Sequence, residues 1–218
     1  MTAANDTPDF VVLGLAGGIG AGKSYVAAAF GRMGFEVCDS DAQARSQLEE
    51  PQVRAALVAR WGAGVLGSDG RIDRGAVASI VFARPEERAW LEGVVHPRLK
   101  AGRAERIAAA RRDGRPGVVI DAPLLFEAGV DRECDAVVWV EAPAAERLRR
   151  VRARGWDEAE LARREAAQWP LEEKRARCAY TVVNADGQAD VDEQVRSVSQ
   201  QVINLIRQRR AGTSRRPA

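Results

Sequence analysis

The chain has 218 residues, of which 46% are hydrophobic and 29% are charged, and its net charge is only +2. This composition suits one globular domain with an inserted sub-domain and gives no compositional argument for a nucleic-acid partner. No apolar run approaches the roughly 20 residues of a membrane-spanning helix, and the first nine residues lack the apolar centre of a signal peptide, so we expect a cytoplasmic protein without a membrane partner. Three widely spaced cysteines form no CxxC pair, which argues against a disulfide framework or a zinc site.

Continuous apolar stretches predict the strands of a buried parallel sheet. They are rich in Val, Ile and Leu and do not alternate with polar residues, as is typical of strands covered on both faces. We expect strands at 10–16, 35–38, 117–121, 136–140 and 180–184. Segments with helical spacing lie at 23–33, 41–60, 73–112, 143–168 and 188–210, and within the third of these we expect a helix at 85–112 that starts at Pro85. This alternation predicts an α/β fold with right-handed crossovers.

The sequence GGIGAGKS, residues 17–24, follows the first predicted strand and precedes the first predicted helix. It matches GxxxxGK[ST] in full, the pattern of a loop whose backbone N–H groups surround phosphates. Lys23 would add a positive charge at the β and γ phosphates, and the Ser24 hydroxyl would bind magnesium. We expect nucleotide contacts from Gly17, Gly18, Gly20, Ala21, Gly22, Lys23, Ser24 and Tyr25. The alternative is a glycine-rich turn that closes a βα unit without nucleotide.

Acidic side chains follow two of the predicted strands. Asp39 and Asp41 come after the second strand, and Asp121 ends the third. In an open α/β sheet, ligands bind at the carboxyl ends of the strands, where acids can position magnesium or accept a proton. The alternative for Asp39 or Asp41 is a cap on the helix that begins near Ala42. Asp121 resembles the acid that holds magnesium beside a phosphate loop, and Asp39 is the other candidate.

Five arginines crowd into eight positions between residues 147 and 154. At helical spacing, Arg147, Arg150 and Arg154 share a face, whereas Arg149 and Arg152 point elsewhere and are better explained as solvated. An arginine fork suits phosphate. The stretch WDEAELARRE that follows has the size of a mobile lid, which phosphotransferases use to exclude water.

Taken in order, these pieces resemble the dephospho-coenzyme A kinase family. The resemblance rests on the segments LAGGIGAGKS, VCDSDAQAR, DGRIDRGAVASIVF, PEERAWLEGVVHPRL, IDAPLLFEAG, VEAPAAERLRRVRAR and REAAQWPLEEKRARCAYTVVNADG, which run from about residue 11 to 187. It implies a phosphate-loop fold of the nucleotide-kinase type: a parallel sheet flanked by helices, an inserted helical substrate domain and a lid. The implied reaction is phosphorylation of the ribose 3′-hydroxyl of dephospho-CoA by ATP with Mg²⁺.

The resemblance also implies roles for particular residues. Asp41 would be the catalytic base, with Lys23 and Arg150 stabilising the transferred phosphoryl group. Substrate contacts would come from Asp41, His96, Leu125, Glu127 and Arg164. Arg154 and Asn184 would bind the nucleotide, and Ser24 with Asp121 the metal. From the residues alone, His96 is as easily a packed or capping residue, Leu125 a core residue and Glu127 a solvated one. Glu165 departs from the family pattern, which usually has an apolar residue after the lid arginine.

We therefore expect a single kinase domain that acts as a monomer or a weak homo-oligomer. Its predicted parts are an extension at 1–9, a domain at 10–211 with its core at 10–40 and 117–210, a helical insertion at about 41–116, a lid at about 153–170 and a frayed tail at 212–218. The alternative function is a nucleoside monophosphate kinase or another small-molecule kinase. A GTP-binding switch is disfavoured because the chain has no Asn-Lys-x-Asp string. A nucleic-acid-binding module would rely on the arginines and lose affinity steeply with salt.

Overall fold

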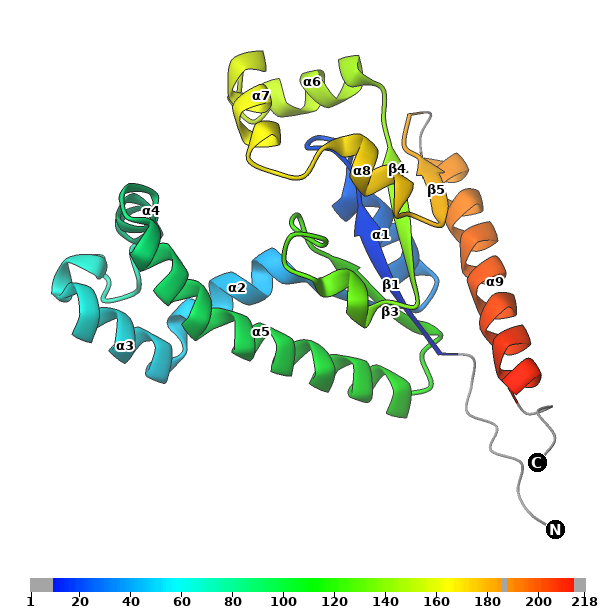
Figure 1. Cartoon of the computed structure of the whole chain (residues 1–218), viewed down its shortest axis with the longest axis horizontal. Helices are drawn as coiled ribbons and strands as arrows, with labels where there is room; N and C mark the ends of the chain where they lie inside the picture. The colour runs from blue at the N-terminus through cyan, green and yellow to red at the C-terminus, as the bar shows by residue number, and fades with distance from the viewer. Residues whose placement is uncertain (1–9, 186–187, 214–218) are drawn as a thin grey trace, which may run out of the picture. The chain divides into compact units, whose positions relative to one another are not determined.

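The computed structural model describes residues 10–185 and 188–213, which divide into two compact units (Figure 1). The first unit takes the residues up to Asp39 and those from Arg106 onward, and the second is Ser40–Glu105. The predicted extension at 1–9 and residues 214–218 of the predicted tail lie outside the described residues. In the part of the chain that is described, no helix is both long and apolar enough to cross a membrane.

A five-stranded parallel sheet with the order β2-β3-β1-β4-β5 forms the centre of the first unit. The strands are β1 (Val11–Ala16), β2 (Glu36–Asp39), β3 (Gly117–Asp121), β4 (Ala136–Glu141) and β5 (Tyr180–Val183). The helical segments of this unit are α1 (Lys23–Arg32), η2 (Val130–Glu133), α6 (Ala144–Arg152), α7 (Glu158–Ala166), α8 (Leu171–Ala176), α9 (Gln188–Thr213) and the end of α5 (Pro85–Arg112). The predicted α/β fold and all five predicted strands are confirmed.

Two apolar layers cover the two faces of this sheet, which is why its strands are apolar throughout. On one face α1 and α9 pack against β1, and Figure 1 shows α9 running beside the strands. On the other face, Leu125, Phe126 and Trp139 pack with Ile107 and Ala110 from the end of α5. Because these last turns of α5 belong to the sheet's core, the helical insertion ends at Glu105 and not near residue 116.

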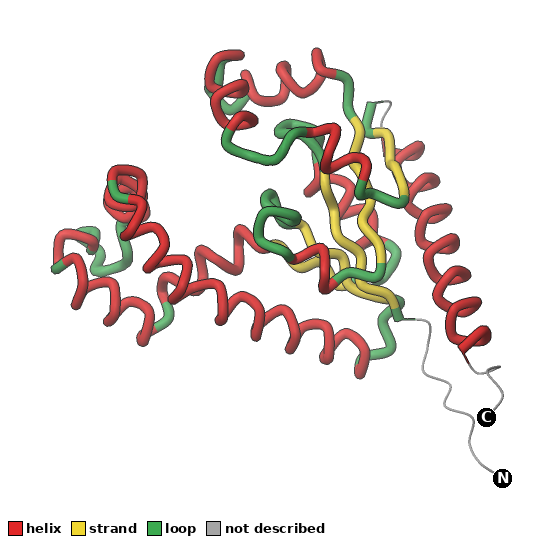
Figure 2. The backbone as a smooth tube through the Cα atoms, in the orientation of Figure 1, coloured by secondary structure: helices red, strands yellow, loops and turns green. Residues whose placement is uncertain are grey.

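The second unit is helical, and the strands drawn in Figure 2 all belong to the first unit. Its elements are α2 (Ser40–Glu49), α3 (Pro51–Trp61), η1 (Ala63–Val65), α4 (Arg74–Ala83) and most of α5. It has its own small core, made of Val53, Leu57, Val65, Ile72 and Val77. The Asp73 carboxylate caps α4 by accepting hydrogen bonds from the N–H groups of Gly75 and Ala76.

Two predicted helices, 41–60 and 143–168, are divided in the structure, and the predicted helix that starts at Pro85 is confirmed. Pro51 and Pro85 each start a new helix, because proline lacks the N–H that would continue the preceding one and suits the first turn of the next. The predicted helix 143–168 breaks after Arg152, and Asp157 caps α7 by accepting from the N–H of Glu160. The short helix α8 was not predicted, since six residues show too little periodicity to be recognised.

Candidate active site

The glycine loop connects β1 to α1 and ends at the first residue of that helix, Lys23. Gly20 and Gly22 have φ angles of 80° and 90°, a region that residues with a Cβ rarely adopt. A Cβ at Gly22 would also lie 2.2 Å from the Nδ2 atom of Asn184. These turns direct backbone N–H groups into the loop, and the N-terminus of α1 adds its dipole, which together favour an anion such as phosphate.

A hydroxyl and a carboxylate meet beside this loop. The Ser24 Oγ atom donates a 2.7 Å hydrogen bond to Oδ2 of Asp121, whose side chain is buried at the end of β3. Asp39 is the register partner of Asp121 on β2, so both acids lie at the carboxyl edge of the sheet. The contact with Ser24 places Asp121 directly beside the loop, where it could support a metal ion.

These oxygen donors fit magnesium held jointly by the protein, water and phosphate. Magnesium usually keeps several waters and takes only one or two protein oxygens beside a nucleotide. Among residues 10–185 and 188–213 there is no cluster of three or more acidic, histidine or cysteine side chains that could hold a metal by itself. The Ser24–Asp121 pair therefore suits a shared site and not a closed protein cage.

Arg150 holds the outer side of the glycine loop. Its Nη1 atom donates to the carbonyl oxygens of Gly20 (3.2 Å) and Ala21 (3.0 Å), and Nη2 donates to that of Asn184 (2.9 Å). The Asn184 Nδ2 atom donates to the same Ala21 oxygen at 2.8 Å. Arg150 and Asn184 thus hold the loop through its carbonyl oxygens. The expected catalytic role of Arg150 stays a prediction.

Arg147, one turn earlier on α6, contacts the opposite end of the loop. Its Nη1 atom lies against Gly18, where a Cβ would come within 2.3 Å of it, and donates to the Ile19 carbonyl oxygen at 3.4 Å. The same nitrogen donates to Oε1 of Glu165 on α7, forming an ion pair. The sequence placed Arg147 on the face of Arg150 but gave it no site role. Its spacing of three residues from Arg150 was the available signal.

The other two predicted arginines, Arg154 and Arg164, lie beyond α6 and on α7. Arg154 falls beyond the end of α6 and is exposed, so the shared helical face expected for it does not extend that far. Arg164 is engaged within α7: its Nε atom donates to Glu160 at 2.5 Å, and its guanidinium stacks on Trp156 at 4.0 Å. Nucleotide contact by Arg154 and substrate contact by Arg164 stay predictions.

Glu127 joins the third strand's loop to α8. Its Oε1 atom accepts hydrogen bonds from Nζ of Lys174 (2.7 Å) and from the N–H of Trp169 (2.9 Å), while Lys174 also donates to Gln168 (2.8 Å). Burial raises the pKa of Glu127, but the hydrogen bonds from Lys174 and Trp169 outweigh it and hold that pKa below its ordinary value. Through Oε1, Glu127 therefore connects the loop after β3 to the segment that leads into α8. The expected substrate contact of Glu127 stays a prediction.

The side chain of the neighbouring Leu125 is only 2% exposed and packs in the sheet's core, where its methyl groups leave no room for a Cβ at Gly14. The core alternative for Leu125 agrees with this burial, and its substrate contact stays a prediction. Leu124, which is 39% exposed, is the accessible apolar side chain of this string.

Asp41 and His96 belong to the second unit. Asp41 lies exposed in the first turn of α2, which begins at Ser40. The capping alternative placed the helix start near Ala42, so Asp41 lies inside the helix and not at its cap. His96 is exposed in the middle of α5, directly before Pro97. Their roles as base and substrate contact stay predictions.

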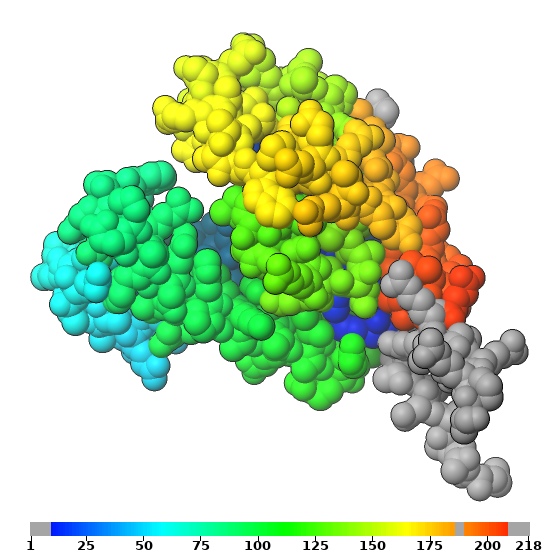
Figure 3. All heavy atoms as spheres, in the orientation of Figure 1, coloured from blue at the N-terminus to red at the C-terminus, as the bar shows by residue number. Residues whose placement is uncertain are grey.

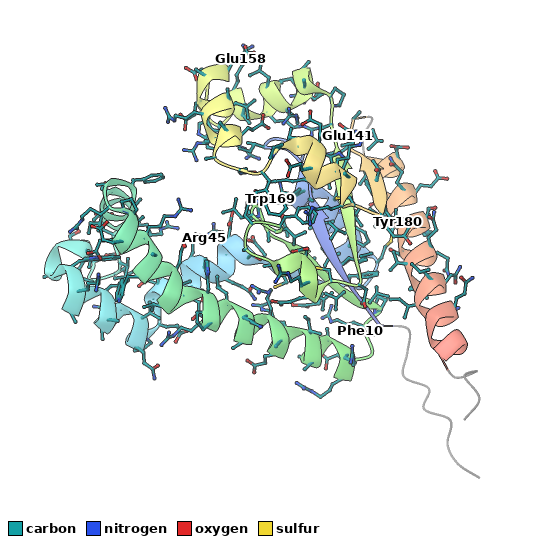
Figure 4. All side chains as sticks on the ribbon, in the orientation of Figure 1. Phe10, Arg45, Glu141, Glu158, Trp169 and Tyr180 are labelled. Carbon is teal, nitrogen blue, oxygen red and sulfur yellow. The ribbon has the colours of Figure 1, made fainter. Side chains whose placement is uncertain are left out.

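A cavity of about 230 Å³ opens beside the glycine loop at the carboxyl end of β4. Gly18 and Arg147 line one side of it, and Trp139, Glu141 and Arg175 line another. The Glu141 carboxylate accepts hydrogen bonds from the Trp139 indole (2.9 Å) and from Arg175. Figure 4 labels Glu141 and Trp169 in this part of the first unit. The cavity adjoins the loop on the side that Arg147 occupies.

A parallel sheet of this order, a glycine loop between β1 and α1, and a serine–aspartate pair beside it define a phosphate-loop kinase of the nucleotide-kinase type. The family model described as dephospho-CoA kinase matches residues 11–190. The chain belongs to the dephospho-CoA kinase family.

Individual relatives agree with this family. The dephospho-CoA kinase of Chlorobaculum tepidum is 34% identical over 201 residues, covering 90% of this chain and 97% of the relative. That of Anaeromyxobacter dehalogenans is 43% identical over 176 residues, covering 80% and 83%. A solved structure of a Thermus thermophilus protein superposes with a TM-score of 0.76 at 37% identity, over 88% of this chain and 97% of the other. Campylobacter jejuni dephospho-CoA kinase, at 22% identity with the same coverage and a TM-score of 0.66, shows the shared fold.

Proposed function

We propose that the protein transfers the γ-phosphoryl group of ATP to the ribose 3′-hydroxyl of dephospho-CoA, giving CoA and ADP, the last step of coenzyme A biosynthesis. The observation that carries this proposal is the phosphate loop with Ser24 bonded to Asp121, in a chain that belongs to the dephospho-CoA kinase family. Phosphoryl transfer depends mainly on positioning and on electrostatic stabilisation, which is what such a loop provides.

Different residues around the loop bind the triphosphate, support the loop and bind the metal ion. The loop's N–H groups and the Lys23 ammonium hold the triphosphate, while Arg150 and Asn184 keep the loop in shape from its carbonyl side. Ser24, oriented by Asp121, holds Mg²⁺, which when bound neutralises charge on the β and γ phosphates. Asp41 accepts the proton of the ribose hydroxyl, and His96 contacts the acceptor substrate.

The decisive experiment is an ADP-release assay with a panel of acceptors. ADP should form with dephospho-CoA and not with AMP, CMP or UMP. Lys23→Ala is the blank, because it removes the charge that the loop offers to the phosphates. ADP release with a nucleoside monophosphate but not with dephospho-CoA would establish the alternative kinase instead.

A second assay tests the base. Asp41→Ala should lower kcat by about 100-fold or more, the usual share of a general base. Asp113→Asn is the matched control, since Asp113 is an exposed acid in the turn after α5 and should leave kcat unchanged. If Asp41→Ala turns over like the control, Asp41 is not the base.

The cell compartment and the oligomeric state of the enzyme are proposed on separate grounds. No disulfide joins Cys38, Cys134 and Cys178 in the described part of the chain, as suits a reducing compartment, and we assign the enzyme to the cytoplasm. We expect a monomer or a weak homo-oligomer, which size-exclusion chromatography with light scattering measures directly. A stable dimer at nanomolar concentration would contradict this expectation.

A further inference from the structure

Arg147 connects the phosphate loop to α7 through a single nitrogen. Its Nη1 atom contacts the backbone of Gly18, the carbonyl oxygen of Ile19 and the carboxylate of Glu165. α6 as a whole rests on the loop here, since a Cβ at Gly20 would lie 2.7 Å from the backbone oxygen of Arg147. Figure 3 shows the atoms of α6 (yellow-green) and α7 (yellow) packed against each other.

The pair is among the more buried ion pairs of α6 and α7. The side chains of Arg147 and Glu165 are 15% and 23% exposed, whereas Arg149 and Arg163 in neighbouring pairs are 71% and 77% exposed. Solvent screens a half-buried pair less than an exposed one. Arg147 therefore acts on the loop through a largely buried charge, as does Arg150, and the Lys23 ammonium donates to the Gly17 carbonyl oxygen at 3.0 Å.

A carboxylate and a phosphate oxygen compete for the same guanidinium. Both are anionic acceptors that an arginine fork binds through charge-assisted hydrogen bonds. Arg147 lines the cavity that opens at Gly18, so its nitrogen borders both the loop and open space next to it. An anion held by the loop's first residues would lie within reach of this nitrogen, and Glu165 would then lose its partner.

We propose that Arg147 is a further triphosphate-binding residue, and that Glu165 is its intramolecular competitor. This inference deepens the proposed function and rests on it, because it assumes that the loop binds a nucleoside triphosphate. Glu165 holds Arg147 and α7 at the loop, and binding of the terminal phosphates transfers Arg147 from the carboxylate to the phosphate. Glu165 thus sets the affinity for nucleotide and couples its binding to the position of α7.

Nucleotide binding in the absence of acceptor measures this directly. Isothermal titration with magnesium and the non-hydrolysable analogue adenylyl imidodiphosphate gives a Kd that does not depend on turnover. Arg147→Gln should raise that Kd by about tenfold, since a charge-assisted hydrogen bond is lost. Glu165→Gln should lower it by about two- to fivefold, since the competing charge is removed. AMP lacks the outer phosphates, so its affinity should respond to neither change.

The opposite changes in Kd distinguish competition between Glu165 and phosphate for Arg147 from a purely structural role of the ion pair. If the pair only braces the loop, both substitutions break the same brace and both weaken binding. The double variant Arg147→Gln/Glu165→Gln should match Arg147→Gln alone, because Glu165 acts only through Arg147. The charge exchange Arg147→Glu/Glu165→Arg restores an ion pair and the melting temperature, yet should bind as weakly as Arg147→Gln or more weakly.

Matched controls carry the same charge changes on the same helices. Arg152→Gln on α6 and Glu158→Gln on α7 alter exposed side chains (Glu158 is labelled in Figure 4) and should leave Kd within twofold. Weaker binding in Glu165→Gln, or no change in Arg147→Gln, overturns the inference. These results are separate from the proposed function, which fails only if the wild-type protein releases no ADP with dephospho-CoA.

Discussion

The segment that contains α7 and α8 is held at its two ends by ion pairs of opposite character. At α7 the Arg147–Glu165 pair is partly exposed and has one further hydrogen bond, to the Ile19 oxygen. At α8 the Glu127–Lys174 pair has a 3% exposed lysine and is completed by Gln168 and the N–H of Trp169. From this difference in burial and in hydrogen bonds we expect the Arg147–Glu165 pair to be exchangeable and the Glu127–Lys174 pair to be permanent. We therefore expect the mobile part of the lid to end before Gln168, and not at residue 170.

The largest effect should come from breaking the permanent end. Lys174→Met leaves the Glu127 carboxylate partly buried without its cation, which costs about 3–5 kcal/mol of unfolding free energy for a buried pair. Urea denaturation followed by circular dichroism measures the loss. Lys100→Met, an exposed lysine on α5, is the matched control and should cost less than about 0.5 kcal/mol.

A double replacement tests whether the loss of unfolding free energy comes from the unpaired charge of Glu127. Glu127→Met/Lys174→Met removes both ions and should recover much of the loss, because an apolar pair of similar volume often replaces a buried ion pair without cost. If Lys174→Met is as stable as the wild type, the α8 end is no more permanent than the α7 end, and the comparison fails.

The pH dependence of stability is a second way to test the α8 end. Lys174 and Trp169 hold the pKa of Glu127 below its ordinary value, although burial alone raises it. A carboxyl with a lowered pKa in the folded state contributes stability that is present above its ordinary pKa and lost as the pH falls through the lower value. Glu127→Gln should thus cost about 1–3 kcal/mol at pH 7.

The difference between Glu127→Gln and wild type should be constant from pH 6 to 8 and shrink below about pH 4.5 as the carboxylate is protonated. Urea denaturation at a series of pH values gives this difference. Asp113→Asn provides a control for general acid effects. A difference that grows as the pH falls would mean that the folded state does not favour the charged form of Glu127.

The two ends also differ in how far the sequence predicts them. The segment GGIGAGKS predicts its loop from local sequence alone, because glycines, a lysine and a hydroxyl occur together within eight residues. The contact between Ser24 and Asp121 could be inferred because Ser24 follows the loop after β1 and Asp121 ends β3. These two strands are neighbours in the sheet. Pairing of Arg147 with Glu165, or of Glu127 with Lys174, depends on where helices pack. No local sequence pattern predicts that packing, so the partners of Glu127 and Arg147 could not be derived from the sequence.

A smaller effect is expected at the exchangeable end. The coupling energy of Arg147 and Glu165 in a double-mutant cycle should be about 1 kcal/mol or less at low salt and should fall as salt screens it. Thermal or urea unfolding of the wild type, both Gln variants and the double variant gives this value. A coupling above about 3 kcal/mol that is insensitive to 0.5 M salt would make this end permanent as well.

The smallest effect concerns Cys178, which follows α8 and donates from Sγ to the carbonyl oxygen of Lys174 at 3.1 Å. Burial raises the pKa of this thiol to about 12, although Arg175 lowers it in part. The folded thiol therefore stays protonated from pH 7 to 8.5. Cys178→Ser should leave the turnover number, and its dependence on pH over that range, unchanged. Iodoacetamide should modify Cys178 only slowly at pH 8, since the thiolate is the reactive form.

Peptide mapping by mass spectrometry follows this modification, and the denatured chain supplies the fully reactive reference. Because the Lys174 backbone accepts from the thiol, loosening α8 by Lys174→Met should speed the reaction at Cys178, whereas Glu165→Gln at the other end should not. Equal acceleration by both variants would show that α7 and α8 open together, so that the lid has no fixed end at Gln168.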